Sequence, residues 1–198
     1  MILSVALDLF AKSYYESVKI RDIATACDIN IALIYYYFGS KKGLFRAAIE
    51  SSIREALGEY AKLRGRADDP VELIEGWFEI NISVYRSLVK LVKISVDYAY
   101  SDARDEEIDR LISDLYQRET DLFTECIDEG IRTGLFHRVD TEEMALFVSV
   151  HLDGIFLASM MRADADVKVL VANLRDILWQ QLGYQPGKRI GLAAARKR

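Results

Sequence analysis

Three consecutive tyrosines followed by a lysine pair form the densest group of side chains in this sequence that could bind a polar partner: Tyr35-Tyr36-Tyr37, Lys41 and Lys42. Successive residues of a helix lie about 100° apart, so three in a row span about 200° and cannot all face one core. Ile34 and Phe38, one turn apart, already supply the inward positions. The alternative, that the tyrosines are core aromatics, is therefore disfavoured, and we expect a binding surface.

Two short helices joined by a tight turn must position these residues. Apolar spacing predicts a first helix over residues 2–13 and a second over 20–27. The pattern breaks at Asp28, and Asn30 then begins a third helix over residues 31–38 as its N-cap. Gly39 ends that helix, and a long fourth helix follows, from Ser40 to about Leu63. This arrangement is typical of a helix-turn-helix.

The string from Ile23 to Phe45, IATACDINIALIYYYFGSKKGLF, closely resembles the signature of the TetR family. In that signature Ile-Ala precedes a turn, the recognition helix ends in Leu/Ile-Tyr-x-His/Tyr-Phe, and a Ser-Lys pair opens the fourth helix. The resemblance covers residues 2–50 in detail and the remainder in layout. Asp28 and Tyr14 stand where the family usually has Gly. Asp tolerates a left-handed backbone, whereas Tyr at positive φ would cost energy.

The resemblance implies an all-α chain of about nine helices. A helix-turn-helix DNA-binding domain of three helices occupies residues 1–46, and the long fourth helix joins it to a helical ligand-sensing and dimerisation domain, residues 47–183. The basic tail, residues 184–198, has no periodicity, and we expect it to be disordered.

Capping residues mark several helices of the larger domain. Asp69-Pro70-Val71-Glu72 combines an N-cap, a proline at the first helical position and a capping-box glutamate. We expect the helix that follows to bend near Leu88. A second long helix should end at Gly134, a third should begin at Asp140, and Gly183 should end the last.

Recognition of DNA divides into phosphate contacts, which set position, and base contacts, which specify sequence. By resemblance, phosphates are contacted by Tyr35, Tyr37 and Lys41, with Lys42 close by, bases by Ile31, Ala32 and Tyr36, and either by Arg21. Ile and Ala cannot form side-chain hydrogen bonds. They would discriminate only by packing on thymine methyl groups or by excluding other shapes.

Aromatic and polar residues on the apolar helix faces of the larger domain are the candidate ligand site. Most of the aromatic residues are expected to be core packing, but buried polar residues need partners, so we place a pocket between these helices. The candidates are Trp77, Phe78, Asn81, Tyr85, Asp97, Tyr98, Tyr116, Phe123 and His151. Their character predicts a hydrophobic or aromatic small-molecule effector with one polar group.

The last two helices are expected to pair with those of a second subunit, because members of the family dimerise through a four-helix bundle. Gly154 fits a close approach, since a mid-helix glycine costs about 1 kcal/mol relative to Ala unless the space is used. A merely tolerated glycine is the alternative. The residues predicted at this homodimer contact are Phe147, His151, Gly154, Ile155, Leu174, Ile177 and Leu178.

Charge and composition exclude several other classes of protein. Residues 1–46 carry six Lys/Arg against four Asp/Glu, whereas residues 47–198 carry 20 against 27, so the basic surface is N-terminal. Cys27 and Cys126 are far apart, and no metal, cofactor or catalytic spacing is present, so we expect neither cofactor nor enzyme. Turnover of a candidate substrate would revive the enzyme class. No secretory signal is evident, and the apolar run 144–161 is interrupted by polar residues, so no membrane role and a cytoplasmic location are expected.

The sequence thus predicts a DNA-binding regulator, by family default a repressor released from a palindromic operator by a small ligand. The alternative is a DNA-binding dimer that is constitutive or controlled by a protein partner, with no small-molecule pocket. An open cavity among the candidate ligand residues would separate the two.

Overall fold

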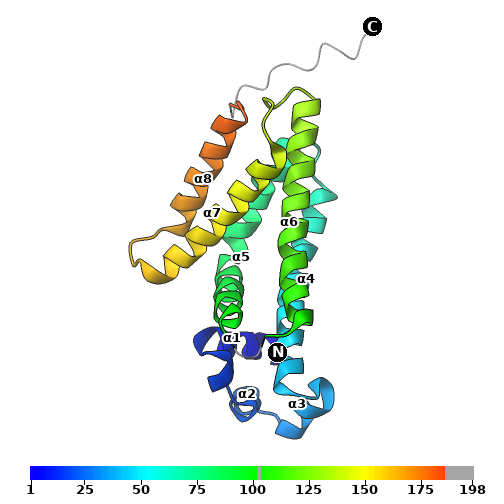
Figure 1. The fold of residues 1–198 in the computed structure, drawn as a ribbon, viewed down its shortest axis with the longest axis vertical. Coiled ribbons are helices and arrows are strands. Elements are labelled where there is room, and N and C mark those ends of the chain that lie inside the picture. The colour runs from blue at the N-terminus through cyan, green and yellow to red at the C-terminus, as the bar shows by residue number, and fades with distance from the viewer. Residues whose placement is uncertain (102–103, 186–198) are drawn as a thin grey trace.

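The computed structural model of the chain describes residues 1–101 and 104–185. Over these ranges it contains eight α-helices, one short 3₁₀ helix and no strand (Figure 1). The all-α prediction is confirmed, with eight α-helices where about nine were expected. The α-helices are α1 (Ile2–Lys12), α2 (Ile20–Ala26), α3 (Ile31–Phe38), α4 (Lys41–Arg64), α5 (Pro70–Ala99), α6 (Glu106–Arg132), α7 (Thr141–Met161) and α8 (Val167–Gln181).

The turn between α2 and α3 is built on a left-handed aspartate. Asp28 has φ 53° and is the only non-glycine residue at positive φ in the described chain. The next amide, that of Ile29, donates to the Ala24 carbonyl at 3.0 Å and closes the end of α2. Tyr14 has φ −57° and is followed by the 3₁₀ turn Tyr15–Ser17, so the chain leaves α1 without the positive φ that a glycine would favour.

Side-chain caps begin α3, α4 and α5 at the predicted residues. The Asn30 side chain accepts from the amide of Ala32 at 2.8 Å, and Ser40 Oγ accepts from the amide of Gly43 at 3.0 Å. Asp69 Oδ1 accepts from the amide of Glu72 at 2.9 Å. Each cap satisfies an amide that has no partner within its own helix, so these capping residues fix where the helices begin.

Helix α5 continues without a break from Pro70 to Ala99, and the bend near Leu88 stays a prediction. Its buried side chains change partners along its length. Ile74 and Trp77 lie in the core of the larger domain, whereas Leu91 lies in the core formed with α1, α2 and α4. The apolar pattern shifts at the middle of α5 because the helix serves two cores, and no break in the backbone is needed.

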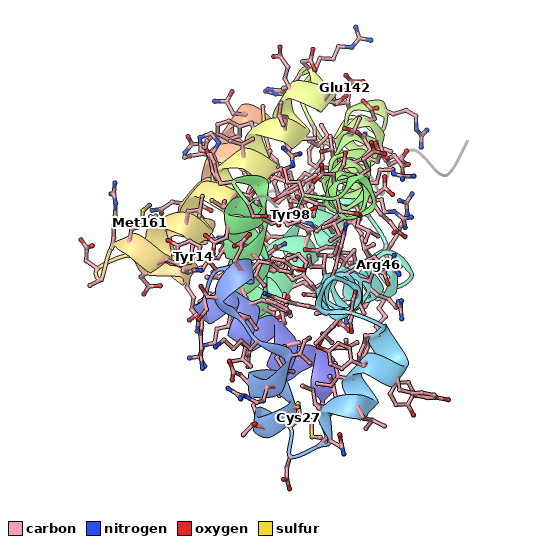
Figure 2. All side chains as sticks on the ribbon, turned by 60° about the horizontal axis from the view of Figure 1, so that its bottom comes forward. Tyr14, Cys27, Arg46, Tyr98, Glu142 and Met161 are labelled. Carbon is pink, nitrogen blue, oxygen red and sulfur yellow. The ribbon has the colours of Figure 1, made fainter. Side chains whose placement is uncertain are left out.

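The two cores do not separate at residue 46. The N-terminal core contains Phe10 and Phe45, together with Tyr98 of α5 and Ile108 of α6. In Figure 1 the ends of α5 and α6 accordingly reach down to α1, and Figure 2 shows Tyr98 in the middle of the molecule. The domain boundary at 46 stays a prediction about function, because the N-terminal core is completed by residues from both sides of it.

Polar contacts reinforce this junction between the domains. Lys90 of α5 pairs with Asp8 of α1 at 2.5 Å, and Arg46 of α4 pairs with Glu107 of α6 at 2.5 Å. The Tyr98 hydroxyl donates to the Asp105 carbonyl at 3.1 Å and accepts from the amide of the same residue. The first turn of α6 is thereby held against the N-terminal core.

Tyr184, the first residue of the predicted disordered tail, packs against the larger domain. Tyr184 lies against Trp179 and Phe136, with ring centroids 4.9 and 6.0 Å away, and its amide donates to the Trp179 carbonyl at 2.9 Å. Residues 186–198, which hold the rest of the predicted tail, lie outside the described residues.

Substituting Tyr98→Phe should lower the free energy of unfolding by about 1–2 kcal/mol, because the Asp105 amide and carbonyl would lose a buried partner. Urea denaturation measures the change. Tyr100→Phe is the control, since Tyr100 is 90% exposed and should leave stability unaltered. Equal stability of the Tyr98→Phe variant and the wild type would show that this hydroxyl does not hold the junction.

Candidate nucleic-acid interface and interior cavity

The recognition-type helix α3 turns its tyrosines outward. Tyr35, Tyr36 and Tyr37 are 49%, 82% and 66% exposed, whereas Ile34 is fully buried. The rings of Tyr36 and Tyr37 meet edge to face, with centroids 5.2 Å apart. The inward position of Ile34 is confirmed, and Phe38 is partly buried beside it. The tyrosines stabilise little of the folded chain and are available to a partner.

The other predicted base-contacting residues lie on the same end of the molecule. Ile31 and Ala32 are exposed in the first turn of α3, and Arg21 is exposed in the first turn of α2. Figure 1 places α2 and α3 together at the end opposite α8, and Figure 2, with this end forward, shows Cys27 between them. The structure thus brings these predicted residues to one surface.

Lys41 is held in place by the 3₁₀ turn after α1. Its ammonium donates to the Glu16 carbonyl at 3.1 Å and lies 4.4 Å from the centre of the Tyr15 ring. Partial burial lowers the pKa of Lys41 from its ordinary value. Tyr15 packs in turn on Phe10 and Phe45, with ring centroids 5.8 and 4.9 Å away, so the lysine is attached to the core. Sequence reasoning missed these contacts of Lys41 because residues 15–17 show no periodicity.

Lys42, which is predicted to lie close to the phosphate contacts, has a charged partner within the chain. Its ammonium forms an ion pair with Asp105 at the start of α6, and hydrogen bonding to this carboxylate raises the pKa of Lys42. Neighbouring residues of a helix point about 100° apart, so Lys41 contacts the turn after α1 while Lys42 contacts the start of α6. Lys42 therefore belongs to the junction between the domains.

An interior cavity of about 40 Å³ lies between α4, α5, α6 and α7. Of the nine predicted ligand residues only Asn81 and Tyr116 line it. Sequence reasoning missed Tyr60, Glu119 and Asp153. Glu119 has charged neighbours along α6, and charged residues on such a helix are usually solvated. The full lining is Ile53, Ala56, Tyr60, Asn81, Leu88, Leu91, Val92, Ser95, Ile112, Leu115, Tyr116, Glu119, Leu152, Asp153 and Phe156.

Two tyrosines and an amide supply neutral polar groups to this cavity. The Tyr60 hydroxyl donates to Asn81 Oδ1 at 3.3 Å, and Asn81 Nδ2 donates to the Trp77 carbonyl at 2.9 Å. Burial raises the pKa of Tyr60 and of Tyr116 above the ordinary phenol value. Both hydroxyls therefore stay protonated and can act as donors over the physiological range.

Two carboxyl groups face the same cavity. Glu119 Oε2 accepts from Ser149 Oγ at 2.8 Å, and burial raises the pKa of Glu119 from about 4.5 to about 7. Burial also raises the pKa of Asp153, while hydrogen bonding to Tyr116 opposes that rise. Burial therefore favours the neutral form of both carboxyl groups, and the charge of the cavity depends on pH.

Three predicted ligand aromatics are core packing instead. Trp77, Phe78 and Phe123 are buried against one another, with ring centroids 5.1 Å apart for Trp77 and Phe78 and 4.5 Å apart for Trp77 and Phe123. Tyr98 belongs to the N-terminal core. Trp77, Phe78 and Phe123 lie on inner helix faces, as predicted, but their rings pack on one another and leave no space for a ligand.

The remaining three ligand candidates lie away from the cavity. Asp97 pairs with Lys93 one turn earlier at 2.6 Å, and the Tyr85 hydroxyl lies 3.5 Å from Arg86 Nε. His151 is exposed on α7, with its ring 4.0 Å from that of Phe147 and its Nδ1 2.7 Å from the Phe147 carbonyl. The structure therefore does not unite Trp77, Asn81, Tyr98 and His151 around one pocket.

Helix α7 presents an exposed apolar face. Leu146 and Val150 are 57% and 58% exposed, and a Cβ added to Gly154 would meet no atom within 4 Å. Figure 2 shows Met161 at the end of α7 that projects from the body. A hollow of about 570 Å³ follows this face toward α8. By length and composition alone α7 could cross a membrane, but one such helix is weak evidence, and 28% of its apolar window is buried.

The predicted dimer residues divide between this face and the core. His151 and Gly154 are exposed, Phe147 and Ile155 are partly buried, and Ile177 of α8 is 43% exposed. Leu174 and Leu178 are instead buried in the core of the single chain, so they cannot contact a second subunit. Both lie on the α8 face that packs against the body, and apolar periodicity alone does not tell an inner face from an outer one.

The fold and the outward-facing α3 define a helix-turn-helix domain of the DNA-binding type on an all-helical body. A family model described as "Bacterial regulatory proteins, tetR family" matches residues 2–48. This match covers the helix-turn-helix domain and ends within α4.

Among curated proteins, the HTH-type transcriptional repressor NicS of Pseudomonas putida is 36% identical over 73 residues. The match covers 37% of this chain and 34% of the length of the repressor.

Solved structures share the fold over nearly the whole chain. A transcriptional regulator from Saccharomonospora viridis in complex with choline has a TM-score of 0.79 at 24% identity, covering 89% of this chain and 93% of its own. A TetR-family regulator from Agrobacterium tumefaciens has a TM-score of 0.76 at 22% identity, covering 90% and 94%.

The raised pKa of Glu119 predicts how stability depends on pH. The folded state binds this proton more tightly than the unfolded chain, so the stabilisation is complete below about pH 4.5 and is lost as pH rises through about 7. Glu119→Gln should therefore lose less stability than the wild type between pH 5 and 8, measured by urea unfolding at each pH. Glu125→Gln, an exposed change on the same helix, should behave as the wild type. Equal pH slopes for the two variants would contradict the burial of an ionisable Glu119.

Proposed function

We propose that the chain is a DNA-binding transcriptional regulator, a repressor, and not an enzyme. The observation that carries this proposal is the outward-facing Tyr35–Tyr37 segment of α3, beside a lysine attached to the core of the same domain. The match to the TetR family over residues 2–48 and the likeness to a curated repressor support it. Such a protein would act in the cytoplasm, where bacterial DNA lies.

On DNA, α3 would enter the major groove. Tyr35, Tyr37 and Lys41 would bind phosphates, which set position, while Tyr36 and the first turn of α3 would read base edges. Tyr36 suits base reading because it is the most exposed of the three tyrosines. Its hydroxyl can donate or accept a hydrogen bond, whereas Ile31 and Ala32 can supply only shape.

The protein would bind as a homodimer through the outer face of α7 and the exposed edge of α8. Exposed apolar residues on α7 support this, because water-exposed apolar patches of this kind mark contact sites. Gly154 supports it as well, since nothing in the single chain occupies the space beside it. A symmetric dimer would bind a palindromic operator, with half-sites one helical turn or more apart.

A small-molecule effector would bind in the cavity between α4 and α7 and release the DNA. The same α4 that lines the cavity at Tyr60 begins beside α3 at Lys41, so a change at one end can reach the other. The structural neighbour complexed with choline supports small-molecule binding by this fold. The alternative, control by a protein partner or none, gains from the smallness of the cavity, about 40 Å³.

Selection of bound fragments from a random duplex library with the purified full chain tests the proposal. We expect enrichment of a palindromic sequence, and gel-shift binding of that sequence with a stoichiometry of one dimer per site. Failure to enrich any sequence, with binding equal for all duplexes, would refute sequence-specific regulation.

Lys41→Ala should weaken binding to every duplex about equally and reduce the salt dependence of log K by about one, because one phosphate contact is lost. Fluorescence anisotropy over a range of salt concentrations measures both. Lys62→Ala removes a lysine from the far end of the same helix and should change neither. Tyr36→Ala should instead alter which base is preferred. A base-specific loss from Lys41→Ala would contradict its assignment.

Gly154→Leu should weaken dimerisation at least tenfold, since the added side chain would separate the paired α7 helices. Sedimentation equilibrium measures the change. Gly58→Leu is the control, because Gly58 also lies in a helix with no atom near the added Cβ, but on α4. A monomeric wild type, or a Gly154→Leu dimer of unchanged affinity, would exclude this interface.

A further inference from the structure

The interior cavity has an unbalanced charge. Glu119 from α6 and Asp153 from α7 both line it, and its lining contains no Lys, Arg or His. The other lining residues are apolar side chains, two tyrosines, Asn81 and Ser95. Two carboxyl groups in one apolar chamber repel each other and lose their hydration, so each is stabilised by a positive charge that the protein itself does not provide.

Glu119 is incompletely satisfied by the protein. Its Oε2 accepts from Ser149, and among the hydrogen bonds of the described residues Oε1 has no donor. Asp153 interacts with the Tyr116 hydroxyl. One carboxylate oxygen of a mostly buried side chain therefore remains to bind a group from a ligand, which buried carboxylates rarely leave unused.

We infer that the cavity binds an organic cation, an amine or quaternary ammonium with apolar or aromatic substituents, with its charge between Glu119 and Asp153. A regulatory role for this cation rests on the proposed function, whereas the binding site does not. The rings of Tyr60, Tyr116 and Phe156 belong to the same lining, and the face of an aromatic ring attracts an ammonium group. The apolar substituents would contact the leucines and isoleucines of α4, α5 and α6.

A bare metal ion does not fit this arrangement. No group of three or more His, Cys, Asp or Glu side chains that could hold a metal occurs among the described residues. Two carboxylates in an apolar chamber would leave such an ion without most of its oxygen ligands. An ammonium group needs fewer direct contacts, because its charge is spread over alkyl substituents.

The size of the cavity fixes how the cation must enter. About 40 Å³ holds roughly one water molecule, whereas ligand pockets usually measure about 300–1,000 Å³. The structure therefore corresponds to a closed state, and occupancy requires α4, α6 and α7 to move apart. Since α4 carries Lys41 at its other end, the same movement would shift the DNA-facing surface.

The site also predicts a proton linkage. The titratable groups facing Glu119 are Tyr60 from α4, Tyr116 from α6 and Asp153 from α7, while α5 contributes only the neutral Asn81 and Ser95. A cation favours the ionised form of Glu119, so the bound state releases its proton. Affinity for the cation should therefore rise as pH increases from 6 to 8, and protons should be released on binding near pH 7.

Isothermal titration of the full chain with a matched pair of probes tests this inference. Phenyltrimethylammonium and tert-butylbenzene have nearly the same shape, and only the first is charged. At pH 8 we expect phenyltrimethylammonium to bind at least tenfold more tightly than tert-butylbenzene. Equal or tighter binding of tert-butylbenzene would overturn the inference in favour of a neutral ligand, and no binding of either probe would overturn it as well.

Variants locate the discrimination within the cavity. Glu119→Gln should bring the two probes to within about threefold of each other, since the Gln side chain can still accept from Ser149 but carries no charge. Glu125→Gln, which removes an exposed charge from the same helix, should retain the tenfold preference. Asp153→Asn gives an independent reading if Glu119→Gln does not fold. A preference that survives both cavity variants would place the cation elsewhere and refute the site.

The proposed function fails separately from this inference. If the chain binds a selected operator but neither probe, the inference is wrong and the regulator remains. If the cation binds through Glu119 but no operator is found, the site is supported and the proposed function is wrong. If both hold, phenyltrimethylammonium should weaken operator binding roughly 5–150-fold, the usual range of allosteric coupling.

Discussion

The burial of one long apolar face, that of α5, is the constraint on which the rest of the structure depends. The first half of this helix packs in the larger core through Ile74 and Trp77, and the second half completes the smaller core through Leu91 and Tyr98. The three N-terminal helices are too short to enclose a core alone, so they fold against the end of α5. The proposed DNA-facing surface is therefore supported by the body of the protein.

Local signals made most of the helices predictable from the sequence, because a cap or a left-handed turn is decided by a few adjacent residues. Asn30, Asp69 and Asp28 all behave as their types suggest. The pairing of Lys42 with Asp105 was not predictable, since 63 positions separate them and neither shows a local pattern. Which helices meet also decides where a cavity lies, so the candidate ligand residues were right in character and mostly wrong in place.

The cavity and the junction between domains share two helices. Helix α6 carries Glu119 at the cavity and, near its first turn, the partner of Arg46. Helix α4 carries Arg46 and, further along, Tyr60 at the cavity. Because backbone hydrogen bonds make a helix stiff, a displacement of either helix at the cavity would also move its end at the junction. Two helices therefore connect the cavity to the proposed DNA-facing end.

The contact of Lys41 with the Tyr15 ring bears on the entropy of the proposed DNA binding. A free lysine side chain loses up to about 2 kcal/mol of rotamer freedom when a contact immobilises it. Lys41 is already confined by Tyr15 and by the Glu16 carbonyl in the absence of DNA, so part of that loss would be paid on folding. A confined ammonium contributes more to net affinity than a freely moving one of the same charge, and one aromatic ring outside the recognition helix sets the difference.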